Sequence, residues 1–203
     1  MLGLPTATEM HKPLPKKTIY AKLQMNTTAK TKMDADISRI NIVNEISSAS
    51  IHIAEGKRVK KFYVVQVVLK KKDYNEKTIA TLSKLISQNM LFVLEYDNEE
   101  KLAIYHTKLM QTPWKPKDGF SLLIKGLTLD AVWENIIIQV GGVEIESDNT
   151  LDEQIEMDDR RQRLEKEIDR LDKLARKEKQ PKKKFELHQQ INGLKKEFSE
   201  ILK

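Results

Sequence analysis

The chain has 203 residues, of which 39% are hydrophobic and 33% charged, and it contains no cysteine. This composition is typical of a soluble globular protein. Without cysteine the chain cannot form a disulfide framework or a zinc site built on thiolates, which fits a reducing compartment. No apolar run reaches the ~20 residues that a bilayer span requires, and residues 1–5 lack the apolar core of a secretion signal. We therefore expect a cytoplasmic protein without contact with a membrane.

Hydrophobic periodicity predicts a helix, three strands and a second helix in the first half of the chain. An inward stripe predicts a short helix within residues 14–28, and an isoleucine-rich segment predicts a strand over 37–46. The alternation over 51–53 predicts a second short strand. Residues 59–69 form the most apolar extended run of the chain, which predicts a central strand. Apolar residues spaced by three and four over 75–87 then predict a helix.

The next segments continue the mixed pattern. Residues 90–96 and 102–106 predict a β-hairpin, because a polar turn separates two extended apolar runs. Residues 120–124 predict another strand, and 129–140 predict a closing helix. Together these elements predict an α+β domain over residues 1–143, with a largely antiparallel sheet.

The order helix, three strands, helix, strand is also the core order of the restriction-endonuclease-like nucleases. Those enzymes hold a divalent cation with an acid near the second strand and an acid-x-lysine pair on the third. The third predicted strand here has Gln66 and Val68 at the positions that should carry the acid and the lysine. The scaffold would therefore be at most a catalytically dead relative of these enzymes.

No other pattern indicates catalytic residues, a metal site or a cofactor. The four histidines are scattered without metal-ligand spacing, and no glycine-rich phosphate loop follows a strand. Asp34 and Asp36 lie beside a predicted strand start, where turn chemistry explains them and a metal site is the alternative. An unorthodox metal-dependent nuclease that uses Asp34, Asp36 or Glu45 stays as a third hypothesis.

Basic residues flank the predicted central strand on both sides. They are Lys57, Arg58, Lys60 and Lys61 before the strand, and Lys70, Lys71 and Lys72 after it. An extended strand would place the two clusters roughly 30 to 40 Å apart, too far for one patch. Solvated strand ends explain them, and the functional alternative is contact with phosphates, which would make the protein a nucleic-acid-binding module.

An acidic segment separates two basic parts of the chain. Residues 144–159 contain eight acids and no base, whereas residues 1–143 and 160–203 each carry a net charge of +7. The acids predict a linker and the start of a helix, since a helix N-terminus stabilises negative charge. Repulsion of nucleic acid or docking of a basic partner is the alternative reading.

The strongest pattern lies in residues 160–203. Apolar residues repeat at helical a/d spacing in two stripes: Leu164, Ile168, Leu171 and Ala175, and then Leu187, Ile191, Leu194 and Phe198. The stripes are out of heptad register with each other, and Pro181 lies at the break, where it suits the first turn of a second helix. We therefore expect an antiparallel helical hairpin whose apolar edges bind a partner.

Several segments of the chain resemble a bacterial family of unknown function. They are Gly3–Glu9, Lys12–Lys17, Asp36–Ile40, Leu85–Phe92, Val132–Ile136 and Lys177–Phe185. Genes of that family lie beside those of DNA methyltransferases and helicase-type restriction subunits in phage-defence clusters. The resemblance covers nearly the whole chain and brings no catalytic motif. It implies an accessory, non-catalytic subunit of a restriction-modification or antiviral complex, with the methyltransferase or the helicase-type subunit as partner.

Overall fold

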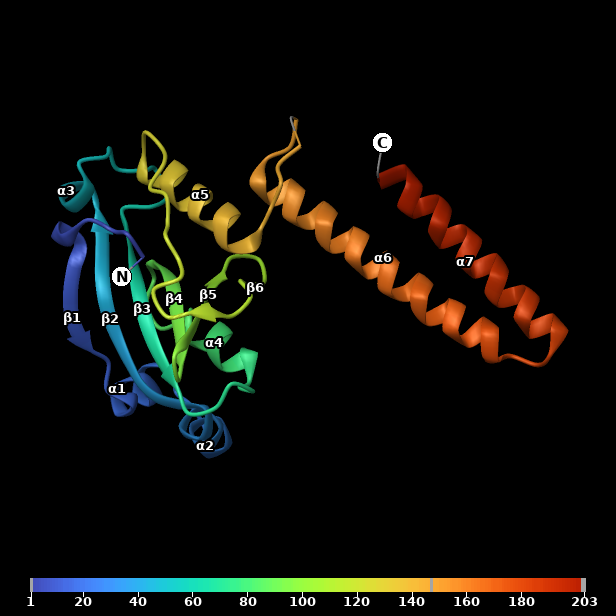
Figure 1. The fold of residues 1–203 in the computed structure, drawn as a ribbon, viewed down its shortest axis with the longest axis horizontal. Coiled ribbons are helices and arrows are strands. Elements are labelled where there is room, and N and C mark those ends of the chain that lie inside the picture. Colours follow the sequence, from blue (N-terminus) through green and yellow to red (C-terminus); the bar gives the residue numbers. More distant parts are fainter. Residues whose placement is uncertain (1, 147, 202–203) are drawn as a thin grey trace. The chain divides into compact units, whose positions relative to one another are not determined.

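A computed structural model describes residues 2–146 and 148–201 of the chain (Figure 1). The chain divides into two compact units, residues 1–143 and 144–203. The first unit contains the sheet and the second contains two long helices (Figure 1).

The first unit is built on a mixed sheet of seven strands. Six follow one another in chain order across the sheet: β1 (Glu9–Pro13), β2 (Ile37–Ser47), β3 (Lys61–Leu69), β4 (Asn89–Tyr96), β5 (Glu99–Tyr105) and β6 (Leu109–Gln111). The short β7 (Lys115–Pro116) pairs with β5. Every pairing is antiparallel except that of β3 with β4, which are joined through α4 (Glu76–Leu82). The predicted α+β class with a largely antiparallel sheet is confirmed.

Helices supply the core on both faces of this sheet. One face packs against α1 (Lys16–Lys22), α2 (Thr27–Asp36) and α4, whose buried residues include Ile19, Met33 and Ile79. Alternate residues of β3 point to the other face, where the Phe62 ring lies 5.0 Å from the ring of Trp133. Trp133 belongs to α5 (Leu129–Gly141). Both faces of β3 and β4 are therefore buried, as expected for the central strands.

The second predicted strand, over residues 51–53, was wrong. The segment after β2 forms a short helix, α3 (Ser48–Ile51), because the Ser50 hydroxyl accepts the backbone N–H of Ser47 at 2.9 Å and starts a helical turn. His52 ends this helix in the left-handed conformation, with φ 55°. Two isoleucines two positions apart were too short a pattern to separate a strand from a helix turn.

The strand predicted over residues 120–124 was also wrong. Its backbone pairs with a side chain in place of another strand: the Leu123 N–H donates to Oε1 of Gln139 at 2.9 Å, and Nε2 of Gln139 donates to the Leu123 carbonyl at 2.9 Å. Leu122 donates its N–H to the carbonyl of Leu2. The segment is extended, and these hydrogen bonds satisfy backbone N–H and C=O groups of the segment although it does not join the sheet.

Other boundaries differ where polar residues decide them. The predicted helix within 14–28 is α1 alone, and Asn26 caps a second helix, α2, by accepting the Ala29 N–H at 2.8 Å. The helix predicted over 75–87 ends at Leu82. Strand β1 was missed because it is polar and largely exposed, and the 3-10 turn η1 (Thr6–Thr8) precedes it.

The second unit is a helical hairpin. Helices α6 (Leu151–Lys177) and α7 (Pro181–Ile201) run side by side and are joined by the turn at residues 178–180 (Figure 1). Thr150 begins α6 with a capping box, in which its N–H donates to Glu153 at 2.8 Å. Pro181 is the first residue of α7, so the predicted break and hairpin are confirmed. Across the described parts of the chain, the helices are either too short or too polar to span a bilayer.

Candidate functional site

The basic cluster before β3 is held by one carboxylate from α5. Asp130 accepts the backbone N–H groups of Lys57 at 2.8 Å, Arg58 at 3.2 Å and Val59 at 2.7 Å. Burial raises the pKa of Asp130, but the three N–H groups outweigh it and hold the pKa below its ordinary value. The loop approaches so closely that a Cβ at Gly56 would lie 2.1 Å from Oδ1 of Asp130.

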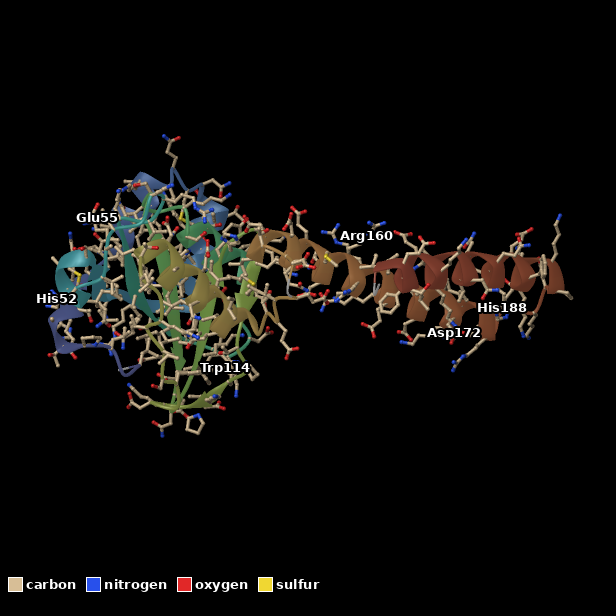
Figure 2. All side chains as sticks on the ribbon, turned by 90° about the horizontal axis from the view of Figure 1, so that it is seen from above. His52, Glu55, Trp114, Arg160, Asp172 and His188 are labelled. Atoms are coloured by element: carbon tan, nitrogen blue, oxygen red, sulfur yellow. The ribbon has the colours of Figure 1, made fainter. Side chains whose placement is uncertain are left out.

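The side chains of this cluster also meet acids. Three ion pairs form: Arg58 with Glu134 at 2.7 Å, Lys60 with Glu55 at 3.2 Å and Lys61 with Glu45 at 3.6 Å. Glu55, which is labelled in Figure 2, lies in the loop between α3 and β3. A phosphate would have to displace these carboxylates to reach Arg58, Lys60 and Lys61.

The basic cluster after β3 is paired in the same way. Nζ of Lys70 donates to the backbone carbonyl of Asp34 at 2.6 Å, and Lys71 forms an ion pair with Asp36 at 2.9 Å. Lys72 forms an ion pair with Glu99, and its Nζ lies over the ring of Trp114, 5.4 Å from the ring centroid. The two clusters lie at opposite ends of β3, and the structure does not bring them together.

The acids of the nuclease hypothesis serve as partners for these and other cations. Asp34 accepts from Nζ of Lys16 at 2.9 Å and from the Tyr20 hydroxyl at 2.6 Å, and these hydrogen bonds lower its pKa. Burial and the nearby Asp34 raise the pKa of Tyr20 to about 12. Asp36 is buried and accepts the N–H of Asn75 at 2.9 Å. Within residues 2–146 and 148–201, no three His, Asp or Glu side chains converge as a metal site.

Sequence reasoning missed a row of polar residues that crosses the middle of the sheet. Nδ2 of Asn41 on β2 donates to Oε1 of Gln66 at 3.0 Å, and Nε2 of Gln66 on β3 donates to Oε1 of Glu95 at 2.8 Å. Glu95 on β4 pairs in register with Glu100 on β5, and Lys117 lies 3.5 Å from Glu95. The signal was present, since Glu95 is an acid inside the apolar run of residues 90–96.

Glu100 is the most unusual member of this row. Its residue exposure is 1%, and neither carboxylate oxygen has a hydrogen-bond partner among the described residues. Burial raises the pKa of Glu100 first, followed by the charges of Asp118 and Glu95. The N–H groups of Asp118 and Phe120 face the carboxylate and lower its pKa, although they are not aligned for hydrogen bonds. This side chain retains a proton to higher pH than an ordinary glutamate.

The apolar stripes of the second unit face each other inside the hairpin. Leu171 and Ala175 of α6 are buried with Ile191 of α7, and Ile168, Leu187 and Leu194 pack against them. We call these six residues the seam. Leu164 and Phe198, the other predicted partner-binding residues, are half-buried. The seam therefore holds the hairpin together, and a partner has to use the surface outside it.

A shallow groove runs beside the seam near the turn. It is lined by Leu174, Lys177, Glu178, Lys183, Glu186 and Leu187. Leu174 is apolar, yet it is 44% exposed in this groove. The helix around it is otherwise largely charged. The groove combines one exposed apolar surface with charges of both signs.

Most basic residues of α6 have acidic partners. The pairs are Arg160 with Glu197, Arg161 with Glu146, Arg163 with Asp159, Arg170 with Glu167, Lys173 with Asp169 and Arg176 with Asp172. Glu146 and Glu153 of the acidic segment are thus used to anchor and cap the start of α6, and the pKa of Glu153 is lowered by the cap. These contacts match the helix-start explanation of the acidic segment.

Taken together, these features define an α+β domain with a helical hairpin, in which most cations beside β3 and on α6 are paired with acids. The chain belongs to the family described as domain of unknown function DUF4391, whose model matches residues 2–198. No curated protein and no solved structure gives a significant match to it.

Proposed function

We propose that this protein is an accessory, non-catalytic subunit of a bacterial restriction-modification or antiviral defence complex. Its hairpin attaches it to a larger DNA-processing protein, either a DNA methyltransferase or a helicase-type subunit. The gene neighbourhood implied by the family resemblance supplies these partners. The single observation that carries the proposal is the small seam of the hairpin, with an apolar groove beside it.

A two-helix unit with such a seam is expected to be marginal by itself. Only Leu171, Ala175 and Ile191 are fully buried in it, and each large apolar side chain contributes about 1.5–3 kcal/mol when buried. Domains below about 70–80 residues rarely obtain more than a few kcal/mol from one core. A third surface that covers Leu174 would add apolar burial where the hairpin lacks it.

The groove also indicates the chemistry of that surface. An apolar side chain of the partner would meet Leu174 and Leu187, and basic groups around it would meet Glu178 and Glu186. An amphipathic helix of the partner fits this description, because helices pack through narrow apolar stripes flanked by charges. We therefore expect a helix of the larger subunit to complete a three-helix arrangement.

Co-purification from the native operon tests the proposal. Leu174→Glu should lose the partner protein, because it introduces a charge into the groove while leaving the seam residues unchanged. The matched control is Leu127→Glu, which alters an apolar side chain of the first unit that is 90% exposed. The control should retain the partner. Retention of the partner by Leu174→Glu, or its loss from both variants, would contradict the proposal.

A further inference from the structure

Positive charge is concentrated at the turn of the hairpin. We call residues 176–185 the hairpin turn. Its ten residues include six bases and one acid, Glu178, which gives a net charge of +5. The bases are Arg176, Lys177, Lys179, Lys182, Lys183 and Lys184. All six are exposed.

These cations differ from the clusters that flank β3 and from most bases of α6, because most of them lack partners. Arg176 pairs with Asp172 at 2.6 Å. In the part of the chain that the structure describes, no carboxylate lies within 4.0 Å of Nζ of the remaining five lysines. The acid of the turn, Glu178, instead accepts the backbone N–H of Gln180 at 2.8 Å. The turn therefore presents positive charge that is available to a ligand.

The arrangement of three of these lysines is a second reason to expect a ligand at the turn. Lys182, Lys183 and Lys184 occupy the first turn of α7, which contains no acid. The positive end of a helix repels cations, so this placement works against the stability of the helix. Successive helical residues project about 100° apart, and the three side chains spread over about 200° of the helix surface. Such an arc can follow a curved chain of phosphates.

Phe185 lies directly beside these lysines and exposes 63% of its surface. Its neighbours in the seam turn inward, but Phe185 is not one of the side chains that pack there. An exposed aromatic ring beside lysines is the combination by which proteins bind unpaired bases and the attached phosphates.

We propose that the hairpin turn binds nucleic acid through its phosphate backbone, with Phe185 stacking on an unpaired base where one is present. The binding is electrostatic and independent of sequence, since lysines contact phosphates as point charges. It is an activity in addition to the proposed assembly function and does not rest on it. It also assigns the nucleic-acid contact to residues of the second unit and not to the clusters at the ends of β3.

Fluorescence anisotropy with the full chain tests this. The probes are a labelled 20-nucleotide single strand and the matching duplex, titrated between 50 and 200 mM salt. Five lysines that each neutralise one phosphate would give a slope of log K against log[salt] of about −4.5 on the duplex. The triple variant Lys182→Gln/Lys183→Gln/Lys184→Gln should weaken binding at least tenfold at low salt. Its slope should be less steep by about 2.7.

The matched control removes the same charge from the paired cluster. Arg58→Gln/Lys60→Gln/Lys61→Gln should change the affinity less than about twofold, because these three side chains are already paired with Glu134, Glu55 and Glu45. Phe185→Ala should weaken binding to the single strand and leave the duplex unchanged. Circular dichroism of each variant checks that the helices remain folded.

Three results would overturn the inference. They are absence of binding by the wild-type chain at 50 mM salt, equal losses in the two triple variants, and unchanged binding by the turn variant. Loss of a co-purifying acidic protein from the turn variant, without any nucleic-acid binding by the wild type, would assign the turn to a protein partner and overturn it as well. Leu174→Glu retains every lysine of the turn. The outcome of the co-purification experiment therefore does not affect the nucleic-acid binding assay.

Discussion

The ends of β3 and the hairpin turn carry the same kind of residue in opposite surroundings. At the strand ends, lysines and an arginine meet acids that come from elsewhere in the fold, such as Glu134 on α5 and Asp36 at the end of α2. At the turn, five lysines lack such partners among the described residues. The difference teaches that clustered positive charge in a sequence indicates a binding surface only where the fold leaves the charge unneutralised.

The two groups of cations differ because acids that hold the loop before β3 come from distant parts of the sequence. Arg58 is 76 residues away from Glu134, and the loop around it is 71 to 73 residues away from Asp130. Only a packed domain can bring such groups together. A two-helix hairpin provides local neighbours and one facing helix, so acids have to be encoded nearby, and the turn contains one acid, Glu178.

The largest expected effect comes from removing the carboxylate that holds the loop before β3. Asp130→Ala should destabilise the first unit by about 3 kcal/mol, because three backbone N–H groups lose a charged acceptor. Chemical denaturation followed by fluorescence of Trp133 and Trp114 measures it. Glu134→Gln is the control, since it removes only an exposed ion pair, which contributes less than about 1 kcal/mol. A loss below about 1 kcal/mol in Asp130→Ala would show that the loop does not depend on this carboxylate.

The next effect concerns Glu100, the buried acid that lacks a cation. Its pKa is above the ordinary value of 4.5, so the folded state holds the proton more tightly than the unfolded chain. Stability should therefore fall as the pH rises from 4.5 through the higher folded-state pKa. Glu100→Gln should remove this dependence and stabilise the unit by about 1–2 kcal/mol at pH 8, with little difference at pH 4. Denaturation at the two pH values checks it, and a destabilised variant at pH 8 would contradict it.

The smallest expected effect is on helix stability and concerns the unpaired lysines of the hairpin turn. Lys183→Glu should stabilise α7 by about 0.3–1 kcal/mol at low ionic strength, because it replaces a cation by an anion at the positive end of the helix. The thermal transition of helicity measures the change, which should disappear in high salt. A destabilised hairpin would mean that the lysine has a structural role in the turn.

Local apolar patterns made much of the fold predictable. The hairpin, α5, β2, β3 and the β4–β5 pair all follow from apolar periodicity within one segment. The failures occurred where polar contacts decided the structure. Residues after β2 form α3 and not the predicted strand, because the Ser50 hydroxyl accepts the Ser47 N–H. Leu123 hydrogen-bonds to the side chain of Gln139 and not to a neighbouring strand.

The candidate site was predictable only in part for the same reason. The seam residues were recognisable by their spacing, but their packing against each other in place of a partner depends on how two helices meet. The pairing of Asp130 with the loop around Lys57 depends on contacts between distant segments. Glu95 was visible as an acid in an apolar run, whereas its neighbour Glu100 becomes notable only when the register of β4 and β5 is known.

Lysine footprinting tests the central comparison most directly. The wild-type chain is acetylated under limiting conditions with and without the duplex and single-stranded probes, and each lysine is read by mass spectrometry. We expect nucleic acid to protect Lys177, Lys179, Lys182, Lys183 and Lys184 and to leave the reactivity of Lys60, Lys61, Lys71 and Lys72 unchanged. Protection at the ends of β3 with an unprotected hairpin turn would contradict the account.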